Sequence, residues 1–353
     1  MTDINTQAAL AIRERIGPLS ELIVKEQYAL HGQNWQDFGE AGRAKSMRDI
    51  GYHLTYLAGA LSAKDQALFS EYIAWVKVLF AGLNFKEDTV PVTLELTRAQ
   101  MEIALPPELF PVVRDFIDQA IIAFHHAPSS LPSYLPETAD NLSRSTRRYV
   151  DLLLMGERQL AASLIHDLVL DNVPVRDIYL KIFQPAQREI GRMWQTNQIS
   201  VAKEHYCTAA TQMIMSQLYP YVFSTDRLGM SMVVTCVESE LHEIGARMVA
   251  DFFEMAGWDT YFLGANTPAK GIIHTLDERN ANLLAISATM SFHVDKVVEL
   301  IRDVRASNHS QKVKIIVGGY PFNLSPNLWK TVGADGYAID AQQAVQMAES
   351  FFR

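Results

Sequence analysis

The sequence predicts a multidomain protein with an N-terminal all-α domain, a four-helix bundle, and a C-terminal α/β domain built on a doubly wound, Rossmann-like parallel sheet. Up to residue 127, apolar residues recur at three- and four-residue spacing, which indicates helices. The same spacing continues over residues 137–224 with short polar breaks, as in an antiparallel bundle. From residue 230, short β-rich apolar runs alternate with amphipathic helical runs, which is typical of a parallel sheet covered by helices.

The N-terminal domain is expected over residues 1–127. A long segment over 62–83 carries its apolar residues on one helical face. A proline pair just before residue 108 predicts a helix over 108–126, because proline is tolerated at a helix start. The following residues, 128–136, are rich in proline and serine, and we expect them to form a linker.

The bundle is expected over residues 137–224 and the α/β domain over residues 230–353. Asn/Pro and Thr/Asn breaks help divide the bundle into four helices, placed at 139–155, 157–171, 174–194 and 199–223. The strands of the α/β domain are placed at 232–237, 259–263, 283–287, 312–317 and 336–339. Its helices are placed at 243–256, 268–279, 292–307 and 341–352.

The composition is that of an ordinary globular protein, with 48% hydrophobic and 20% charged residues among 353. The net charge of −9 and the lack of a Lys/Arg block argue against direct nucleic-acid binding, because phosphate neutralisation needs clustered basic side chains. We expect neither a signal peptide nor a membrane span. Two cysteines, Cys207 and Cys236, are too few for a disulfide framework and predict a cytoplasmic location.

Small or chemically active residues follow the predicted strands at their carboxyl ends, where open α/β sheets bind ligands. After the first strand, His242 stands between Glu240 and Gly245, and Glu240 is placed to accept a hydrogen bond from the imidazole. A histidine in this position can ligate a metal-bearing cofactor. The ends of the other strands have small side chains that would leave a slot, or a resting place for a phosphate. These residues are Gly264, Ser287, Thr289, Ser291, Gly318 and Gly319.

Two other doubly wound folds fit the strand pattern but lack their own motifs. A receiver domain needs an acidic pair after the first strand and an Asp after the third. A dinucleotide-binding domain needs G-x-G-x-x-G after the first strand. Neither arrangement occurs in this sequence, so a different ligand is expected at the strand ends.

The α/β domain resembles the cobalamin-binding domain of methionine synthase and its relatives, whose motifs are D-x-H-x-x-G, S-x-L and G-G. Here the motifs read Glu240-x-His242-x-x-Gly245, Ser287-x-Thr289 and Gly318-Gly319, with Glu in place of Asp and Thr in place of Leu. The resemblance covers residues 230–353 and implies base-off cobalamin binding. It implies His242 as the lower cobalt ligand, and a nucleotide tail in the slot past Ser287.

A second motif, W-x9-E-H, is formed in the bundle by Trp194, Glu204 and His205. The tryptophan ends one predicted helix and the other two lie on the next, so all three can face one site. As isolated residues they would fit a plain core and a solvated surface. Upstream of a cobalamin domain, the motif resembles the helical cap of CarH-type light sensors. The resemblance implies that these three residues hold the 5′-deoxyadenosyl group of adenosylcobalamin.

Gln195 departs from this resemblance. CarH-type sensors have a histidine directly after the tryptophan, and that histidine ligates cobalt after photolysis. An amide is a poor ligand for Co(III), so the upper ligand after light is left open between another histidine and water.

The N-terminal domain lacks the basic recognition helix of CarH-type repressors. The arrangement as a whole resembles photocobilins, which pair cobalamin with biliverdin. No cysteine precedes position 207, so a bilin in this domain would be non-covalent. Arginines could meet its propionates, while the alternative is that the candidate residues belong to the surface and core of a plain bundle. These candidates are His31, Trp35, Arg43, Arg48, Tyr52, His53, His125 and His126.

These resemblances together predict a light-sensing adenosylcobalamin protein that is not an enzyme. Photolysis of the Co–C bond would shift the bundle against the α/β domain and change the oligomeric state or the binding of a protein partner. The alternative is a corrinoid methyl-carrier protein of a methyltransferase system, although a carrier needs an open upper face and Trp194 would obstruct it. A third reading is an interaction module that binds no corrin.

Overall fold

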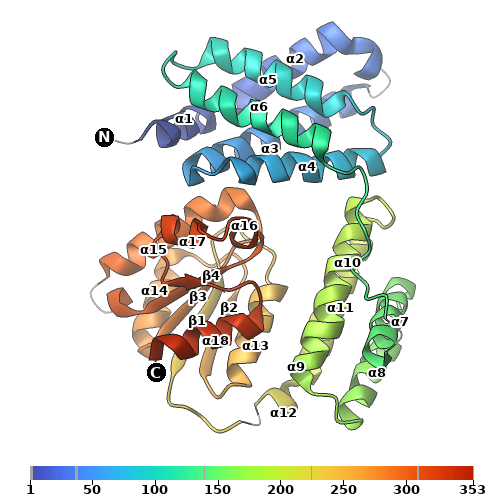
Figure 1. Cartoon of the computed structure of the whole chain (residues 1–353), viewed down its shortest axis with the longest axis vertical. Helices are drawn as coiled ribbons and strands as arrows, with labels where there is room; N and C mark the ends of the chain where they lie inside the picture. Colours follow the sequence, from blue (N-terminus) through green and yellow to red (C-terminus); the bar gives the residue numbers. More distant parts are fainter. Residues whose placement is uncertain (1–2, 36–38, 139, 224, 308–309, 353) are drawn as a thin grey trace.

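Three bodies make up the chain in the computed structural model, which describes residues 3–35, 39–138, 140–223, 225–307 and 310–352, with the backbone alone for residues 31–35. The N-terminal helices lie across the top of the view in Figure 1, the bundle stands at the right, and the α/β domain lies below at the left. The described part of the chain therefore has the helical domain, the bundle and the parallel-sheet domain that the sequence predicts.

The described residues of the N-terminal domain form six helices. They are α1 (Ile4–Arg13), α2 (Ile16–Trp35), α3 (Gly39–Ala63), α4 (Gln66–Gly82), α5 (Thr89–Ala104) and α6 (Phe110–His126). The helix expected at residue 62 begins at Gln66, because the Asp65 side chain accepts the Ala67 backbone N–H and caps that end. Similarly, the last helix starts two residues later than expected and has Pro111 in its first turn.

A buried lysine on α4 binds the carboxyl end of α6, the last helix of the N-terminal domain. The Lys77 ammonium on α4 donates to the carbonyls of Phe124 and Ala127 at 2.8 and 2.7 Å, which satisfies acceptors at the carboxyl end of α6. The chain from residue 127 to residue 138 then forms no helix or strand before the bundle begins.

The bundle contains α7 (Asn141–Met155), α8 (Arg158–Leu170), a composite helix, α11 (Val201–Gln217) and the short α12 (Tyr219–Val222). The composite helix joins α9 (Val175–Ile178), the π-helical turn η2 (Tyr179–Phe183) and α10 (Gln184–Gln195). Gly156, at a φ of 85°, ends α7 in the left-handed conformation that glycine adopts readily. The Ser200 hydroxyl caps α11 by accepting the Lys203 backbone N–H.

The C-terminal domain has a five-stranded sheet in the order β2-β1-β3-β4-β5, and all its paired strands are parallel. The strands are β1 (Ser231–Cys236), β2 (Asp259–Gly264), β3 (Leu283–Ser287), β4 (Lys314–Gly318) and β5 (Gly336–Tyr337). The fourth strand was expected from residue 312, but residues 310–312 form a 3-10 turn and the strand begins at Lys314. Buried runs in β1, β3 and β4 explain why these central strands read as continuous apolar segments.

Helices cover both faces of the sheet, with α13 (Ile244–Glu254) and α18 (Ala341–Phe352) packed together on one of them. The other face carries α14 (Ala269–Arg279), the 3-10 turn η3 (Ser291–His293) and α15 (Val294–Ala306). Two short helices, α16 (Tyr320–Leu324) and α17 (Leu328–Val332), connect β4 to β5 and were not predicted. This alternation gives the doubly wound sheet its two buried layers.

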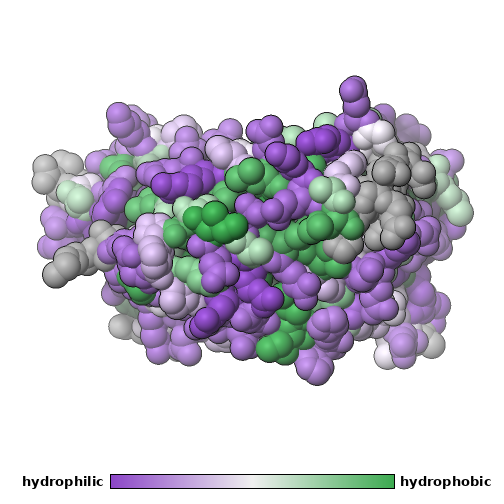
Figure 2. Space-filling model, turned by 90° about the horizontal axis from the view of Figure 1, so that it is seen from above, coloured by the Kyte–Doolittle hydropathy of each residue, from purple (hydrophilic) through white to green (hydrophobic). Residues whose placement is uncertain are grey.

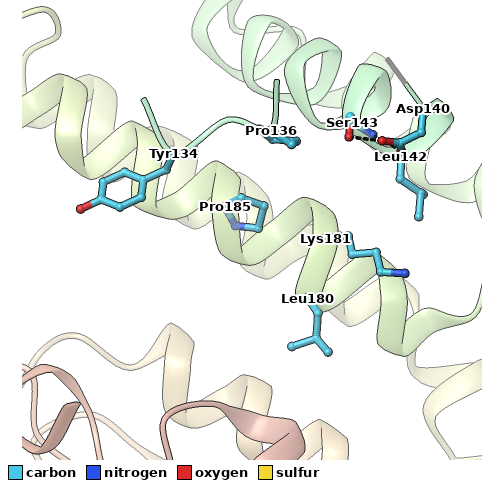
Figure 3. Close-up of a pocket in the computed structure, with 8 residues that line it drawn as sticks. All are labelled: Tyr134, Pro136, Asp140, Leu142, Ser143, Leu180, Lys181 and Pro185. Atoms are coloured by element: carbon cyan, nitrogen blue, oxygen red, sulfur yellow. Dashed lines mark hydrogen bonds between the residues drawn. The ribbon is translucent and has the colours of Figure 1, made fainter. Parts of the chain in front are cut away.

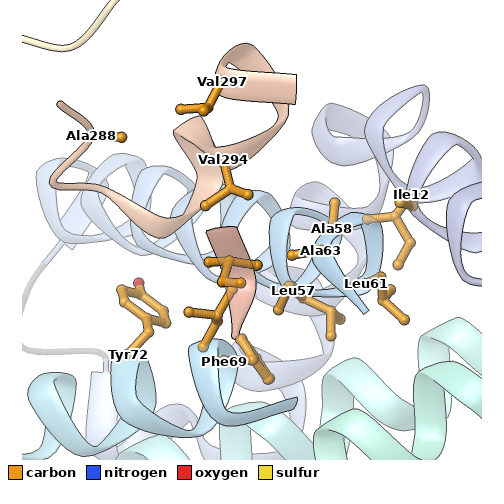
Figure 4. Close-up of a cluster of buried hydrophobic side chains, with 14 of the residues drawn as sticks. Ile12, Leu57, Ala58, Leu61, Ala63, Phe69, Tyr72, Ala288, Val294 and Val297 are labelled. Carbon is orange, nitrogen blue, oxygen red and sulfur yellow. The ribbon is translucent and has the colours of Figure 1, made fainter. Parts of the chain in front are cut away.

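Two apolar cores meet at the sheet. One core joins the sheet face under α14 and α15 to the N-terminal domain, and Figure 4 shows Leu57 and Leu61 of α3 in the same cluster as Val294 of α15. The other core joins the sheet face under α13 and α18 to the bundle. Each helical body is therefore packed onto a different layer of the C-terminal domain.

Figure 2 looks onto the N-terminal domain, where hydrophilic residues cover most of the face and apolar patches lie between them. Leu10, Leu22 and Ile103 are among the exposed apolar residues of this domain. Among the described residues, no helix combines the length and apolar character that a membrane crossing requires.

The bundle and the α/β domain share a buried polar contact whose strength should depend on pH. The Tyr179 hydroxyl, on η2, donates to Asp251 on α13 at 2.8 Å. Burial raises the pKa of Asp251 from 3.8 to about 6. The folded protein therefore holds this proton more tightly than the unfolded chain, and its stability falls as pH rises from about 4 through about 6.

Asp251→Asn should remove this pH dependence. In wild type it lowers the free energy of unfolding by about 3 kcal/mol at most between low and neutral pH. The amide keeps an acceptor for Tyr179 and does not ionise, so the variant should gain stability relative to wild type between pH 4 and pH 8. Urea unfolding at several pH values measures the effect, and Asp167→Asn at an exposed position of α8 is the control. Parallel pH profiles for Asp251→Asn and wild type would contradict the prediction.

Candidate functional site

The carboxyl ends of three neighbouring strands line up at one edge of the sheet. Cys236 of β1 pairs with Ser287 of β3, and Ser287 pairs with Gly318 of β4. The loops that follow these strands contain most of the residues singled out in the sequence, so the parallel topology brings those residues to one place. The elements that follow β3 and β4 at this edge, η3 and α16, contact α3 and α4 of the N-terminal domain, which lies above the sheet in Figure 1.

Glu240 is the centre of this edge and is fully buried. Its Oε1 accepts from the His242 backbone N–H at 3.0 Å and lies 2.6 Å from His242 Nδ1. Its Oε2 accepts from the Thr289 and Met290 backbone N–H groups at 2.8 and 3.1 Å, and lies 2.9 Å from His293 Nδ1. One carboxylate therefore ties the loop after β1 to the turn after β3.

Hydrogen bonding decides the charge of this carboxylate. Burial alone would raise the pKa of Glu240, but hydrogen bonds from His242, His293 and backbone N–H groups together hold it far below its ordinary value. The hydrogen bond to Glu240 in turn raises the pKa of His242, and the charge of Glu204 adds to this shift. Glu204 of the bundle thus lies near enough to influence a residue of the sheet edge.

His242 is oriented by one ring nitrogen and leaves the other available. Its Nδ1 contacts Glu240, its side chain is 58% exposed, and within the described part of the chain its Nε2 has no hydrogen-bond partner. This is the arrangement of a metal-binding histidine, in which a carboxylate fixes the tautomer and increases the basicity of the ligating nitrogen. The expected contact between Glu240 and His242 is present.

The remaining residues of the predicted slot lie at or just after the ends of the strands. Gly245 lies in the first turn of α13 with open space where a Cβ would be, and Gly264 ends β2 with a φ of 77°. Gly319 has a φ of 105°, and a Cβ there would lie 2.0 Å from the Ala288 carbonyl oxygen. Ser291 has a buried hydroxyl that, among the described residues, makes no hydrogen bond.

The bundle presents the Glu204–His205 pair, with 2.5 Å between Glu204 Oε2 and His205 Nδ1. The Thr208 hydroxyl also donates to Glu204 at 3.0 Å, while the His205 side chain is 73% exposed. Glu204 is thus held in place by two neighbours, whereas His205 is open to a ligand or to solvent.

Trp194 and Gln195 contact the N-terminal domain. The ring of Trp194 lies 5.8 Å from that of Trp75 on α4, measured between centroids. The Gln195 side-chain amide is buried and donates to the Trp75 carbonyl at 3.0 Å. Gln195 therefore has a structural role in joining the bundle to α4, which sequence reasoning did not anticipate.

Two surface pockets lie away from these residues. A pocket of about 430 Å³ lies between the segment before α7 and the composite helix, with Tyr134, Ser143 and Pro185 in its lining (Figure 3). A smaller pocket of about 180 Å³ lies beyond the end of β1, between α14 and α15, and includes Lys296. Neither pocket is lined by a residue predicted to bind a cofactor.

The tetrapyrrole candidates of the N-terminal domain differ in their exposure. His53 is buried with its Nδ1 2.8 Å from the Tyr72 hydroxyl, and burial lowers its pKa to about 4. Tyr52 is half exposed, Arg43 lies over the ring of Tyr28, and Arg48 is exposed. Exposed positions at the end of α6 hold His125 and His126, while the side chains of His31 and Trp35 lie outside the described residues. A bilin in this domain stays a prediction.

His293 is the residue of the site that sequence reasoning missed. It is 6% exposed and makes its contact with Glu240 across 53 residues of sequence. The local signal is a histidine at the start of a predicted helix, between Phe292 and Val294, and such a histidine is more often a satisfied core residue.

Two family models, both described as B12 binding domains, match residues 146–219 and 230–346. Dimethylamine corrinoid protein 1 of Methanosarcina mazei is 30% identical over 183 residues, which are 48% of this chain and 83% of that protein. A corrinoid protein of Desulfitobacterium hafniense is 24% identical, over 56% of this chain and 92% of that protein. The structure of the Methanosarcina barkeri monomethylamine corrinoid protein shares the fold, with a TM-score of 0.52 and 20% identity over 58% of this chain and 97% of that one.

A parallel sheet with an oriented histidine after its first strand, preceded by a helical bundle, defines a cobalamin-binding protein. The chain belongs to the family of corrinoid proteins that includes the dimethylamine corrinoid proteins. These relatives are named as corrinoid proteins and not as enzymes, which agrees with the expectation that the chain is not itself an enzyme.

The main functional prediction, light sensing by adenosylcobalamin photolysis, is wrong. The relatives are corrinoid proteins of methylamine systems, which fit the alternative reading of a methyl carrier. The error came from the W-x9-E-H motif. Trp194, Glu204 and His205 all lie in residues 146–219, where a general B12 binding model matches, so the region that contains the motif is not specific to light sensors.

Proposed function

We propose that this protein is a corrinoid methyl carrier, which accepts a methyl group at one partner methyltransferase and delivers it at another. The observation that carries the proposal is His242, held by a buried carboxylate at the strand edge in a chain whose relatives are dimethylamine corrinoid proteins. Methyl transfer to and from cobalt is the chemistry that a bound cobalamin supplies.

The donor set at the sheet edge fits such a cofactor. His242 offers an unpartnered Nε2 to the lower face of a corrin, among the described residues, and Glu240 fixes its orientation. The unpartnered Ser291 hydroxyl and the small residues Ser287 and Gly318 are suited to receive the nucleotide tail at the strand ends. On the bundle, Glu204 and His205 are suited to contact the upper face.

Methyl delivery also requires the bundle to give access to the upper face. Polar contacts between the bundle and α13 include Gln212 donating to Glu243 at 2.9 Å, Tyr179 donating to Asp251, and Arg247 donating to Ser216 and Tyr219. Hydrogen bonds to charged groups contribute about 1.5–3 kcal/mol each, and the apolar core between the bundle and the sheet adds to them. We therefore expect the bundle to move only when a partner methyltransferase supplies contacts that replace these. The adenosyl form of the cofactor, the bilin, a homo-oligomer and a cytoplasmic location stay predictions, and methyl carriage requires none of them.

The test is the transfer of labelled methyl groups to the reconstituted full chain. Holoprotein reduced to the Co(I) state is incubated with dimethylamine labelled in its methyl carbons and with extract of the native host. Protein-bound methylcobalamin should acquire the label, and His242→Ala should acquire much less. Failure of dimethylamine, monomethylamine and methanol alike to label the bound cofactor would contradict the proposal.

A further inference from the structure

The N-terminal domain, residues 3–126, lies outside the matched B12 binding regions and packs directly on the turn that holds Glu240. Helix α3 contacts η3, α15 and α17 of the C-terminal domain, and α4 contacts α16 and α10. Ion pairing between Arg13 and Asp295 and a hydrogen bond from the Tyr320 hydroxyl to Glu71 join the same two bodies. This interface is continuous with the apolar core described above.

The closest approach is backbone to backbone. A Cβ added to Gly59 of α3 would lie 2.7 Å from the Phe292 Cα, a distance that real Cβ atoms do not adopt. Only glycine lets α3 approach η3 this closely. The separation of the helix from the turn is therefore set by Gly59, and any side chain there would push the two apart.

Aromatic contacts extend this interface around the turn. The Tyr56 ring meets the Phe292 ring edge-on with 4.9 Å between centroids, and the Tyr56 hydroxyl donates to the Met290 sulfur at 3.6 Å. Behind it, Tyr72 stacks on Tyr56 at 3.6 Å, and the Phe292 and His293 rings meet at 4.4 Å. The N-terminal domain thus contacts both residues on either side of Ser291.

Among the described residues, the same turn supplies three of the five hydrogen-bond contacts to the Glu240 carboxylate. They are the backbone N–H groups of Thr289 and Met290 and the ring of His293. Glu240 uses its other oxygen to orient His242. A continuous series of contacts therefore runs from α3 through residues 290–293 and Glu240 to the ring of His242.

We propose that the N-terminal domain positions the lower cobalt ligand. Gly59 sets the distance between α3 and the turn over residues 290–293, and His293 is the positioning residue that contacts Glu240. The proposal rests on His242 being that ligand, as in the proposed function. When α3 is docked, the turn holds Glu240 and His242 in the ligating geometry. When α3 is displaced, Glu240 loses its support and His242 is released more readily.

The experiment compares substitutions in the full chain loaded with cob(II)alamin, using electron paramagnetic resonance. An axial nitrogen splits the cobalt lines, and labelling the histidines of the protein with the heavier nitrogen isotope changes that splitting only where histidine is the ligand. The labelled protein therefore reports the His-ligated fraction, apart from the cofactor's own base and without any measurement of methyl transfer. Gly59→Ala should lower the ratio of ligated to unligated protein by about tenfold or more, the scale of losing an outer contact to a metal ligand. Gly51→Ala on the same helix is the matched control, because its Cβ would meet atoms at an ordinary 3.8 Å.

A second pair of variants tests His293. His293→Leu removes the hydrogen bond to Glu240 and should lower the ligated fraction, whereas His293→Asn places an amide near the Nδ1 position and should restore it. Rescue by asparagine would separate positioning from simple packing, because leucine fills the volume equally well.

The spectra of these variants can each overturn the proposal. A folded Gly59→Ala protein with the wild-type spectrum overturns the proposal. If Gly59→Ala fails to fold, Tyr56→Leu takes its place, and a wild-type spectrum there has the same consequence. A wild-type protein whose splitting does not respond to histidine labelling refutes His242 as ligand and this inference with it, whereas a histidine splitting that Gly59→Ala leaves unchanged refutes the inference alone.

Discussion

Alanine in place of His242 is expected to remove the axial nitrogen from protein-bound cobalamin and to weaken cobalamin binding by more than the roughly 10- to 100-fold that losing an outer-shell partner costs. The side chain is 58% exposed, so the apoprotein should lose little stability. The carboxylate of Glu240 would keep its contacts to His293 and to the turn backbone. The loss should therefore be confined to the cofactor.

Equilibrium dialysis with hydroxocobalamin and the spectrum of the bound cofactor measure both effects. His274→Ala is the matched control, because His274 is an exposed histidine on α14 of the same domain. Wild-type affinity together with an unchanged axial nitrogen that responds to isotope labelling of histidine in His242→Ala would mean that another histidine ligates cobalt. In that case the interpretation of the Glu240–His242 pair would have to be abandoned.

The sequence predicted those helices and strands whose apolar residues repeat with one regular spacing along the whole element. The central strands are buried on both faces, so their apolar runs stood out in the sequence. The π-helical turn over residues 179–183 was not predicted, because one inserted residue hardly alters the helical spacing of apolar side chains. The helices after Gly319 were also missed, since each has five residues and gives no periodic signal.

The candidate site was predictable to the extent that its residues are close in sequence. Glu240 and His242 are two residues apart, and their contact follows from the motif. His293 reaches the same carboxylate only through the folding of β3 beside β1, so nothing local marks it. The contact of Gly59 with Phe292 depends on the docking of two domains, which a single sequence does not encode in any local pattern.

Function was predicted least well, and Trp194 shows why. A tryptophan before a Glu-His pair indicates an aromatic side chain near a cofactor, but it does not indicate which upper ligand the cofactor carries. In the structure the indole contacts Trp75, and the neighbouring Gln195 bonds to the same residue. Both positions are therefore accounted for by the packing of the bundle against α4, which neither an adenosyl group nor a second cobalt ligand is needed to explain.

Gly319→Ala is expected to lower the stability of the cobalamin domain more than any other glycine-to-alanine substitution in it. Gly319 has φ and ψ of 105° and 176°, a conformation that is essentially restricted to glycine. Its Cβ would also lie 2.0 Å from the Ala288 oxygen. The backbone strain and the displacement of the chain after β3 should together lower the free energy of unfolding by about 2–4 kcal/mol.

Gly319→Ala should weaken cobalamin binding by a larger free energy than it removes from the stability of the fold. Ala288 lies between Ser287, at the strand edge, and Thr289, whose N–H holds Glu240. Moving Ala288 away from Gly319 would disturb the proposed tail slot and the support of the lower ligand together. Gly271→Ala on α14 is the control, because its Cβ would meet open space. If Gly319→Ala unfolds at a lower urea concentration yet binds cobalamin normally, Gly319 is needed only for the conformation of the turn. Loss of cobalamin binding at urea concentrations well below the unfolding midpoint would instead place the nucleotide tail beside Gly319.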